Sequence, residues 1–312
     1  MRKRYPRGIM ATACVPWTED FQFDETMFRR EVDMLWDQGI RSIYLFGTAG
    51  EGYIVSNRQF HQITAAFADA LRGRDGALPM VGVISLSTDE ILQRIEAAAE
   101  LGIRDFQVSF PSWGAVTESE AVNFLHYVCD RFPELRFMHY NNGMRSKTKL
   151  GAAVYARLAE EIPNLVAVKH TAATMAEIAD IMKRDLPLQF FFLENAYGYA
   201  SLMGEASLLI SLCNIQYSKA WEYFQAGVRQ DTKTLMTLEQ ELNTCAQALA
   251  VLPQGKIDGA YDKLFVKYAI KDFPQRLYPP YEGMTDAQFQ QFDTALRTML
   301  PEWFGCASDG HV

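Results

Sequence analysis

The feature that most constrains the fold is a repeated alternation along the chain of 312 residues. Short, continuous apolar runs alternate with longer segments that have the 3.6-residue period of amphipathic helices. Continuous apolar runs are typical of strands buried on both faces, as in a parallel sheet covered by helices, and eight in succession favour closure into a (β/α)8 or TIM barrel. The predicted strands are residues 9–15, 42–47, 79–85, 105–110, 136–140, 165–170, 189–194 and 207–213.

Capping residues support the helix boundaries, because Ser, Thr and Asp favour helix starts and Gly favours helix ends. The expected starts are Asp24, Ser56, Ser87 and Thr117, and the expected ends are Gly39, Gly73 and Gly102. From about Ser218 onward only helical patterns occur, within 221–227, 235–249, 261–270 and 285–300. We therefore expect a catalytic barrel over 1–217 and a C-terminal helical region over 218–312 that serves packing or assembly.

Charge and cysteine usage exclude several classes of protein. The net charge is −8 with no basic stripe, which argues against a nucleic-acid partner, and no stretch of about 18 apolar residues predicts a membrane span. The basic start, residues 1–8, is interpreted as a solvated arm. Five widely spaced cysteines without a CxxC pair indicate neither a disulfide framework nor a zinc site, so a reducing cytoplasm is the expected location.

Chemistry in such a barrel is expected at the carboxyl ends of the strands. There, Lys169 directly follows the apolar residues 166–168, and lysine is rarely buried unless it is paired or functional. Desolvation favours the neutral amine, the form that attacks a carbonyl carbon to give an imine. The competing interpretation is a lysine that extends to the barrel mouth or pairs with a loop carboxylate.

Two further elements end neighbouring strands. Tyr140 ends the fifth predicted strand, where its phenol could move protons, although a rim tyrosine that caps a loop is the simpler interpretation. The turn at residues 47–52, GTAGEG, could present backbone N–H groups and the Thr48 hydroxyl to a carboxylate. Its glycine spacing is neither a Rossmann fingerprint nor a P-loop, so the alternative to anion binding is a plain tight turn.

Taken in order, these elements resemble the dihydrodipicolinate synthase/N-acetylneuraminate lyase family, which has a GTxGE-like turn after strand two, YN ending strand five and a Schiff-base lysine ending strand six. Here they are GTAGE (47–51), YNN (140–142) and VAVK (166–169). The resemblance covers about residues 8–230, including ATACVPWTEDFQFDE (11–25), which is similar to the family's TPF-x-x-D segment.

The resemblance implies a class I aldolase in which Lys169 forms the imine, Tyr140 shuttles protons and Thr48 holds the carboxylate of a 2-oxo acid. It also implies a homotetramer in the cytoplasm that needs no cofactor and no metal. The remaining expected substrate-binding residues are Gly47, Ala49, Gly50, Glu51, Trp113, Asn142, Arg145 and His170.

Departures from the family pattern bear on the substrate. Ala49 replaces the second hydroxyl of the family's usual pair, His170 stands where the synthases have glutamate, and Trp113 lies where they have tyrosines, which argues against lysine biosynthesis. The segment around Trp113 and the residue Asn142 are instead similar to hydratase-aldolases that cleave benzylidenepyruvates. An exposed tryptophan is equally typical of a subunit interface.

We therefore expect a lyase that uses pyruvate or another 2-oxo acid with an aldehyde. The alternatives are dihydrodipicolinate synthase itself, a 2-keto-3-deoxy sugar acid dehydratase with polar residues around Ser112, His170 and Asn195, and a non-enzymatic protein that binds or senses 2-oxo acids. A metal-dependent aldolase is disfavoured, because His139 and His170 have no evident third ligand.

Overall fold

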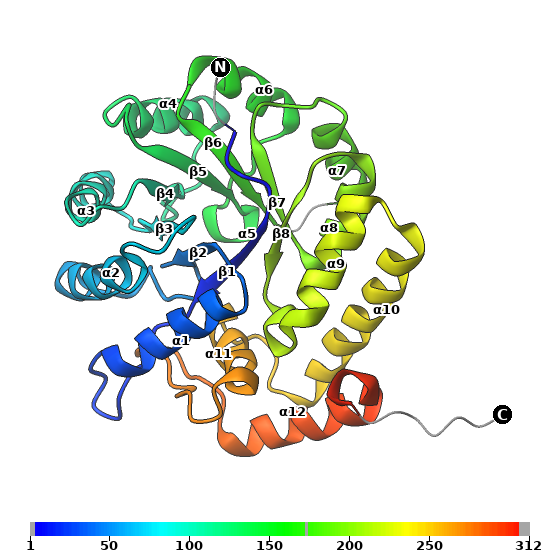
Figure 1. The fold of residues 1–312 in the computed structure, drawn as a ribbon. Coiled ribbons are helices and arrows are strands. Elements are labelled where there is room, and N and C mark those ends of the chain that lie inside the picture. Colours follow the sequence, from blue (N-terminus) through cyan, green and yellow to red (C-terminus); the bar gives the residue numbers. More distant parts are fainter. Residues whose placement is uncertain (1–3, 172–173, 306–312) are drawn as a thin grey trace.

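Eight parallel strands form a closed barrel in the computed structural model, which describes residues 4–171 and 174–305. Each strand pairs with its sequence neighbours, and β8 closes the ring against β1. Figure 1 shows the strands at the centre and the helices around them. The strands are β1 Ile9–Ala13, β2 Ser42–Leu45, β3 Leu78–Gly82, β4 Asp105–Val108, β5 Arg136–Asn141, β6 Leu165–His170, β7 Gln189–Leu193 and β8 Ser207–Ile210. The predicted TIM barrel is confirmed.

Helices alternate with the strands. They are α1 Glu25–Asp37, α2 Asn57–Leu71, α3 Thr88–Glu100, α4 Glu118–Cys129, α5 Gly143–Ser146, α6 Ala152–Glu161, α7 Met175–Met182 and α8 Glu194–Met203. The four predicted N-caps are confirmed, since each side chain accepts a backbone N–H of the first turn. The three predicted end glycines all have positive φ, between 74° and 96°.

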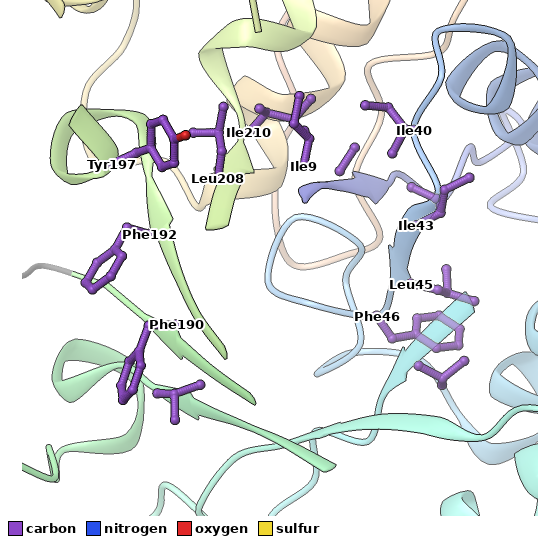
Figure 2. Close-up of a cluster of buried hydrophobic side chains, with 14 of the residues drawn as sticks. Ile9, Ile40, Ile43, Leu45, Phe46, Phe190, Phe192, Tyr197, Leu208 and Ile210 are labelled. Atoms are coloured by element: carbon purple, nitrogen blue, oxygen red, sulfur yellow. The ribbon is translucent and has the colours of Figure 1, made fainter. Parts of the chain in front are cut away.

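Alternation along the strands separates two apolar layers. Outward side chains fill the space between strands and helices, as Figure 2 shows for Ile9, Ile43, Phe190, Phe192 and Leu208. The residues between them point inward and form a separate cluster in the barrel, made of Met10, Tyr44, Met80, Met138, Phe191 and Leu209 among others. This inner layer fills the barrel below its carboxyl end, and a cavity lined by strand ends lies at the mouth.

The amino-terminal end of the barrel is closed by residues that precede β1. Tyr5 is buried among the inward side chains, and its N–H donates to the carbonyl of Val166. The Arg136 guanidinium lies 5.4 Å from the Tyr5 ring centroid and 2.6 Å from the Asp105 carboxylate. The prediction of a solvated arm is therefore wrong for Tyr5, whose ring serves as a plug, whereas Pro6 is exposed. Residues 1–3 lie outside the described residues.

The chain after β8 is helical, as expected. Its elements are η1 Leu212–Ile215, α9 Tyr217–Arg229, α10 Thr232–Ala248, η2 Leu249–Val251, α11 Asp258–Ala269, α12 Asp286–Met299 and η3 Pro301–Phe304. α9 packs against β1 and β8, and α10 packs outside α8 and α9 (Figure 1). α11 instead contacts η1, directly after β8, and so lies at the carboxyl end of the barrel.

Three sequence expectations concern the chain as a whole. The division into regions 1–217 and 218–312 stays a prediction. Residues 1–3 and 306–312, at the outer ends of the two regions, lie outside the described residues. Cys14, Cys129, Cys213 and Cys245 are buried free thiols, whereas Cys306 lies outside the described residues. Within 4–171 and 174–305, no helix is long and apolar enough to cross a membrane.

Candidate active site

Lys169 lies near the end of β6, where the strand holds its amine against two aromatic rings. Its Nζ is 4.2 Å from the ring centroid of Tyr140, its register partner on β5, and 5.0 Å from that of Tyr44 on β2. Only 6% of the residue is exposed. An amine that is buried at the mouth of the barrel, and not at its rim, is placed to react with a ligand that enters the mouth.

A cavity of about 110 Å³ opens beside this amine. Its lining includes Thr12, Thr48, Ala49, Tyr140 and Thr171. The Thr171 hydroxyl is buried and has no hydrogen-bond partner among the described residues. A small cavity with an amine and several hydroxyls suits a short polar molecule. We call it the inner cavity.

Tyr140 is oriented by a hydrogen bond from its own loop. The Asn142 side-chain Nδ2 donates to the Tyr140 hydroxyl over 2.8 Å, and its Oδ1 accepts the N–H groups of Met144 and Arg145 in α5. Because a phenol can accept one hydrogen bond while donating another, the Tyr140 proton remains available to a ligand. Asn142 therefore fixes the tyrosine and the loop together.

The turn after β2 is sterically locked. Phe46 has a φ of 63°, and a Cβ on Gly52 would lie 2.3 Å from the Phe46 carbonyl oxygen. Within the turn, the N–H groups of Glu51 and Gly52 donate to the carbonyls of Thr48 and Gly47. These two donors are therefore not available to a ligand, whereas the Thr48 side chain lines the inner cavity.

Two other glycines of the turn serve its packing. A Cβ on Gly47 would lie 2.5 Å from the Tyr44 ring, and one on Gly50 would lie 2.8 Å from the Phe46 nitrogen. Both positions therefore need glycine to let the turn approach the strand. Neither lines the inner cavity, in contrast to Ala49.

Glu51 does not face the cavity, which corrects its assignment as a substrate-binding residue. Its carboxylate is fully buried 2.6 Å from the Lys263 ammonium and accepts hydrogen bonds from the Trp17 indole and the Tyr278 N–H. These three donors occupy most of the acceptor positions of the carboxylate, which leaves little of it for a ligand. Glu51 thus ties the turn to α11.

His170 also faces away from the amine, because successive strand residues point to opposite sides. Its Nδ1 lies 3.0 Å from the Asn141 side-chain nitrogen, in the layer between β6 and the helices. Burial, assisted by the charge of Lys149, lowers its pKa to about 4, so the ring is neutral near pH 7. The expectation that His170 binds substrate is corrected to a buried strand residue.

A second, outer cavity of about 210 Å³ adjoins the first and shares Thr48 and Tyr140 with it. Its walls combine apolar surface with polar side chains: the former comes from Tyr53, Ile84, Phe110, Ile257 and Tyr281, the latter from Ser109, Ser112, Ser146 and Arg145. The site therefore has a small compartment at the amine and a larger one, with several aromatic and aliphatic walls, beyond the tyrosine.

Arg145 and Trp113 lie at the outer compartment. Arg145 lines the outer cavity, and its guanidinium is already paired with Asp258 of α11 over 2.8 Å. Trp113 is 86% exposed and lines neither cavity, although its neighbour Ser112 does line the outer one. The Lys147 ammonium donates to the Trp113 carbonyl, which holds the loop and leaves the indole free. In this chain alone, Trp113 is not a wall of the site.

Sequence reasoning missed Asp262, which α11 brings into the inner cavity. The residue is 7% exposed, and its carboxylate accepts a hydrogen bond from the Ser211 hydroxyl over 2.7 Å. Burial raises its pKa to about 7, and the Ser211 hydrogen bond opposes the rise. The available signal was the charged pair Asp262–Lys263 directly before the apolar residues 264–266, since charges in such a run are expected to be partnered or functional.

With a closed parallel barrel and a buried amine at its mouth, the chain falls in the class of TIM barrels whose active sites lie at the carboxyl ends of the strands. Among residues 4–171 and 174–305, no group of three or more His, Cys, Asp or Glu side chains is placed to hold a metal ion. The model of the Dihydrodipicolinate synthetase family matches residues 5–253, and the chain belongs to this family. Members of the family are carbon–carbon lyases of the class I aldolase type.

Named relatives differ in their reactions. A 4-hydroxy-tetrahydrodipicolinate synthase of Salinibacter ruber is 25% identical over 56% of this chain and 57% of its own length. An N-acetylneuraminate lyase of Pongo abelii is 25% identical over 73% of each chain. A trans-2'-carboxybenzalpyruvate hydratase-aldolase of Nocardioides sp. is 29% identical over 52% of this chain and 49% of its own. The chain thus spans little more than half of the first of these relatives and about half of the last.

Solved structures share the fold. YagE, a prophage protein of the dihydrodipicolinic acid synthase family from E. coli K12, was solved in complex with pyruvate; it has a TM-score of 0.82 and 17% identity, over 96% of this chain and 99% of its own. A putative dihydrodipicolinate synthetase from Pseudomonas aeruginosa has a TM-score of 0.84 at 17% identity, over 95% of this chain and 100% of its own.

Proposed function

We propose that this chain is a lyase in which Lys169 forms a Schiff base with pyruvate or another small 2-oxo acid. The observation that supports this most is the Lys169 amine, buried between the rings of Tyr140 and Tyr44 beside a cavity of about 110 Å³. The neutral amine attacks the 2-oxo carbon, water leaves, and the protonated imine then withdraws electrons from the adjacent carbon. A carbon–carbon bond to that carbon forms or breaks.

Neighbouring groups supply binding and proton transfer in this proposal. The Thr48 hydroxyl, with N–H groups of its turn other than those of Glu51 and Gly52, holds the carboxylate of the 2-oxo acid beside the amine. The Tyr140 phenol lines both cavities and is held by Asn142, so it is placed to exchange a proton between the acid and the aldehyde.

The aldehyde is proposed to occupy the outer cavity. Its apolar walls suit an aromatic or extended apolar group better than a polyhydroxy chain, in line with the hydratase-aldolase among the relatives. A sugar acid dehydratase would need polar groups near Ser112, His170 and Asn195. Ser112 does line the outer cavity, but His170 faces the helical layer and Asn195 is exposed on α8.

The central experiment is trapping with borohydride. Wild-type protein incubated with pyruvate and borohydride should gain one reduced pyruvyl adduct by mass spectrometry, and peptide mapping should place it on Lys169. Lys169→Ala should gain none, while Lys183→Ala, which removes an exposed surface amine, should be labelled like wild type. An adduct that survives in Lys169→Ala would contradict the proposal.

Turnover separates an enzyme from a protein that only binds 2-oxo acids. Benzylidenepyruvates and 2-keto-3-deoxy sugar acids, each assayed for release of pyruvate, should differ, with the aromatic compounds cleaved faster. Loss of water from the sugar acids is followed separately, and adduct formation without cleavage or dehydration of any compound would instead support a binding or sensory role. We also propose the family's homotetramer, which light scattering would test through the molecular mass.

A further inference from the structure

The inner cavity contains an acid as well as an amine, and the two come from distant parts of the chain. Lys169 lies one residue before the end of β6, whereas Asp262 lies in the second turn of α11, beyond the barrel strands. Both line the same cavity. The Lys263 side chain, next in sequence, pairs with Glu51 and so fixes the rotation of α11 relative to the barrel. This ion pair therefore holds Asp262 in a fixed position at the mouth.

The environment of Asp262 favours a carboxyl group that carries its proton near neutral pH. Burial is the largest influence, and nearby acids add to it, whereas Ser211 and Lys169 oppose it. The titratable groups that interact with it electrostatically are Lys169 of β6, Glu194 of α8, Asp258 of α11, Glu31 of α1 and Cys14 after β1. Three of the five are carboxyl groups. Burial, with the acids Asp258 and Glu194, outweighs the Ser211 hydrogen bond and the Lys169 amine, so the pKa of Asp262 rises to about 7.

The two proton-bearing groups at the amine lie on different sides. Tyr140 lines both cavities and therefore stands between the 2-oxo acid and the aldehyde. Asp262 lines only the inner cavity, with Leu209, Ile210 and Ser211 at the end of β8. Asp262 and Lys169 therefore line the same small volume, apart from the outer cavity in which the aldehyde is proposed to bind.

We propose that Asp262 is the catalytic acid that removes water from the carbinolamine on Lys169. This inference rests on the imine chemistry proposed above. Attack of the amine gives a carbon that bears nitrogen and hydroxyl. The Asp262 proton passes to that hydroxyl as the carbon–oxygen bond breaks, the nitrogen lone pair forms the C=N bond, and water leaves. In hydrolysis, the Asp262 carboxylate takes a proton from the attacking water, which restores the acid.

The first test measures the rate of imine formation with the full-length protein. Wild type, Asp262→Asn and Asp272→Asn are mixed with pyruvate and quenched with borohydride at increasing times, and the adduct is quantified by mass. Asp262→Asn should label on Lys169 to the same final extent but about 10²-fold more slowly, as expected when a general acid is removed. Asp272→Asn, at an exposed carboxylate beyond α11, should match wild type.

A pH profile distinguishes acid catalysis from a packing defect. The wild-type rate should fall as pH rises through about 7, where Asp262 loses its proton, and Asp262→Asn should lack this fall. Ser211→Ala removes the donor that stabilises the carboxylate, so it should move the fall to higher pH. This second variant keeps the catalytic carboxyl and remains informative if Asp262→Asn folds poorly.

The outcomes separate the two proposals. If wild type forms no adduct with any 2-oxo acid, the imine proposal fails and this inference fails with it. If wild type is labelled while Asp262→Asn reacts at the same rate, or Ser211→Ala leaves the profile in place, only the role of Asp262 is overturned.

Discussion

The two ends of the barrel are built from similar polar and aromatic groups but use them differently. At the amino-terminal end, the Tyr5 ring fills the opening and Arg136 pairs with Asp105 over 2.6 Å. At the carboxyl end, Lys169 lies against Tyr140 beside open space, and the Thr171 hydroxyl has no hydrogen-bond partner among the described residues. At the first end, a ring and an ion pair from the chain itself close the barrel, whereas the second end has open space and an unpartnered hydroxyl beside the amine.

This contrast implies that substitutions at the two ends should separate activity from stability. Groups that await a ligand contribute little to the folded state, because their contacts are not yet made. Groups that plug the barrel contribute to folding and touch no substrate. The predictions below run from the largest expected effect to the smallest.

Tyr140→Phe should lower kcat by about 10² to 10⁴-fold, the usual effect of removing a group that transfers protons. The free energy of unfolding should fall by only about 1 kcal/mol, the value of the lost hydrogen bond from Asn142. Steady-state kinetics and urea unfolding measure the two. A variant that keeps wild-type turnover would remove Tyr140 from the mechanism.

Lys263→Met should lower both stability and activity, since Lys263 holds α11 at the mouth through its ion pair with Glu51. It leaves the fully buried Glu51 carboxylate without its cation, which costs about 3 to 5 kcal/mol of unfolding free energy. Because α11 also positions Asp262, kcat should fall as well. The matched control is Lys267→Met on the same helix, whose partner Asp286 is 82% exposed, and its effect should stay below about 1 kcal/mol.

Tyr5→Ala should lower the free energy of unfolding by about 3 kcal/mol, because it removes a buried ring from the closed end. The kcat of the folded variant should equal that of wild type. Arg4→Ala, which removes only a partly exposed ion pair with Glu205, is the control. A specific loss of turnover in Tyr5→Ala would show that the two ends are coupled.

Acidification should weaken the layer between strands and helices, away from both ends. Burial lowers the pKa of His139 to about 3 and that of His170 to about 4, below the unfolded value near 6.5. The unfolded chain then binds more protons, so stability present above pH 6.5 is lost as pH falls, by about 2 kcal/mol per histidine at pH 5.

Urea unfolding between pH 7 and pH 5 checks this prediction. His139→Phe should reduce the loss on acidification by about half, whereas His61→Gln, on the exposed face of α2, should leave it unchanged. An equal loss in wild type and His139→Phe would mean that other groups dominate the acid response.

The barrel was predictable because its strands are continuous apolar runs with Ser, Thr, Asp and Gly at the helix boundaries. The end of β6 was predicted to the residue, and Lys169 and Tyr140 indeed meet there. Strand alternation predicts that His170 points to the other side of the sheet from Lys169, but the family motif placed it at the substrate. The family motif likewise predicted that Glu51 binds substrate. Its ion pair with Lys263, 212 residues later, instead shows that it ties the turn to α11.

Tyr5 and Asp262 could not be placed from sequence for a different reason. Each acts through contacts with residues far along the chain, Val166 for Tyr5 and Ser211 for Asp262. Local periodicity contains no information about which strand end a distant helix will cover. The sequence therefore predicted the helix at 261–270 but not what it covers, and it predicted a solvated arm where Tyr5 is buried.

The position of α11 has a consequence for biosynthesis. Ribosomes release a chain from its amino terminus, at about 5 to 20 residues per second. All eight strands have been made once residue 210 is complete, yet the helix that covers η1 and pairs with Glu51 ends only at residue 269. For several seconds, a nascent barrel would hold Lys169 while its mouth still lacked one wall. Completion of the pocket therefore depends on synthesis of a segment that follows the barrel.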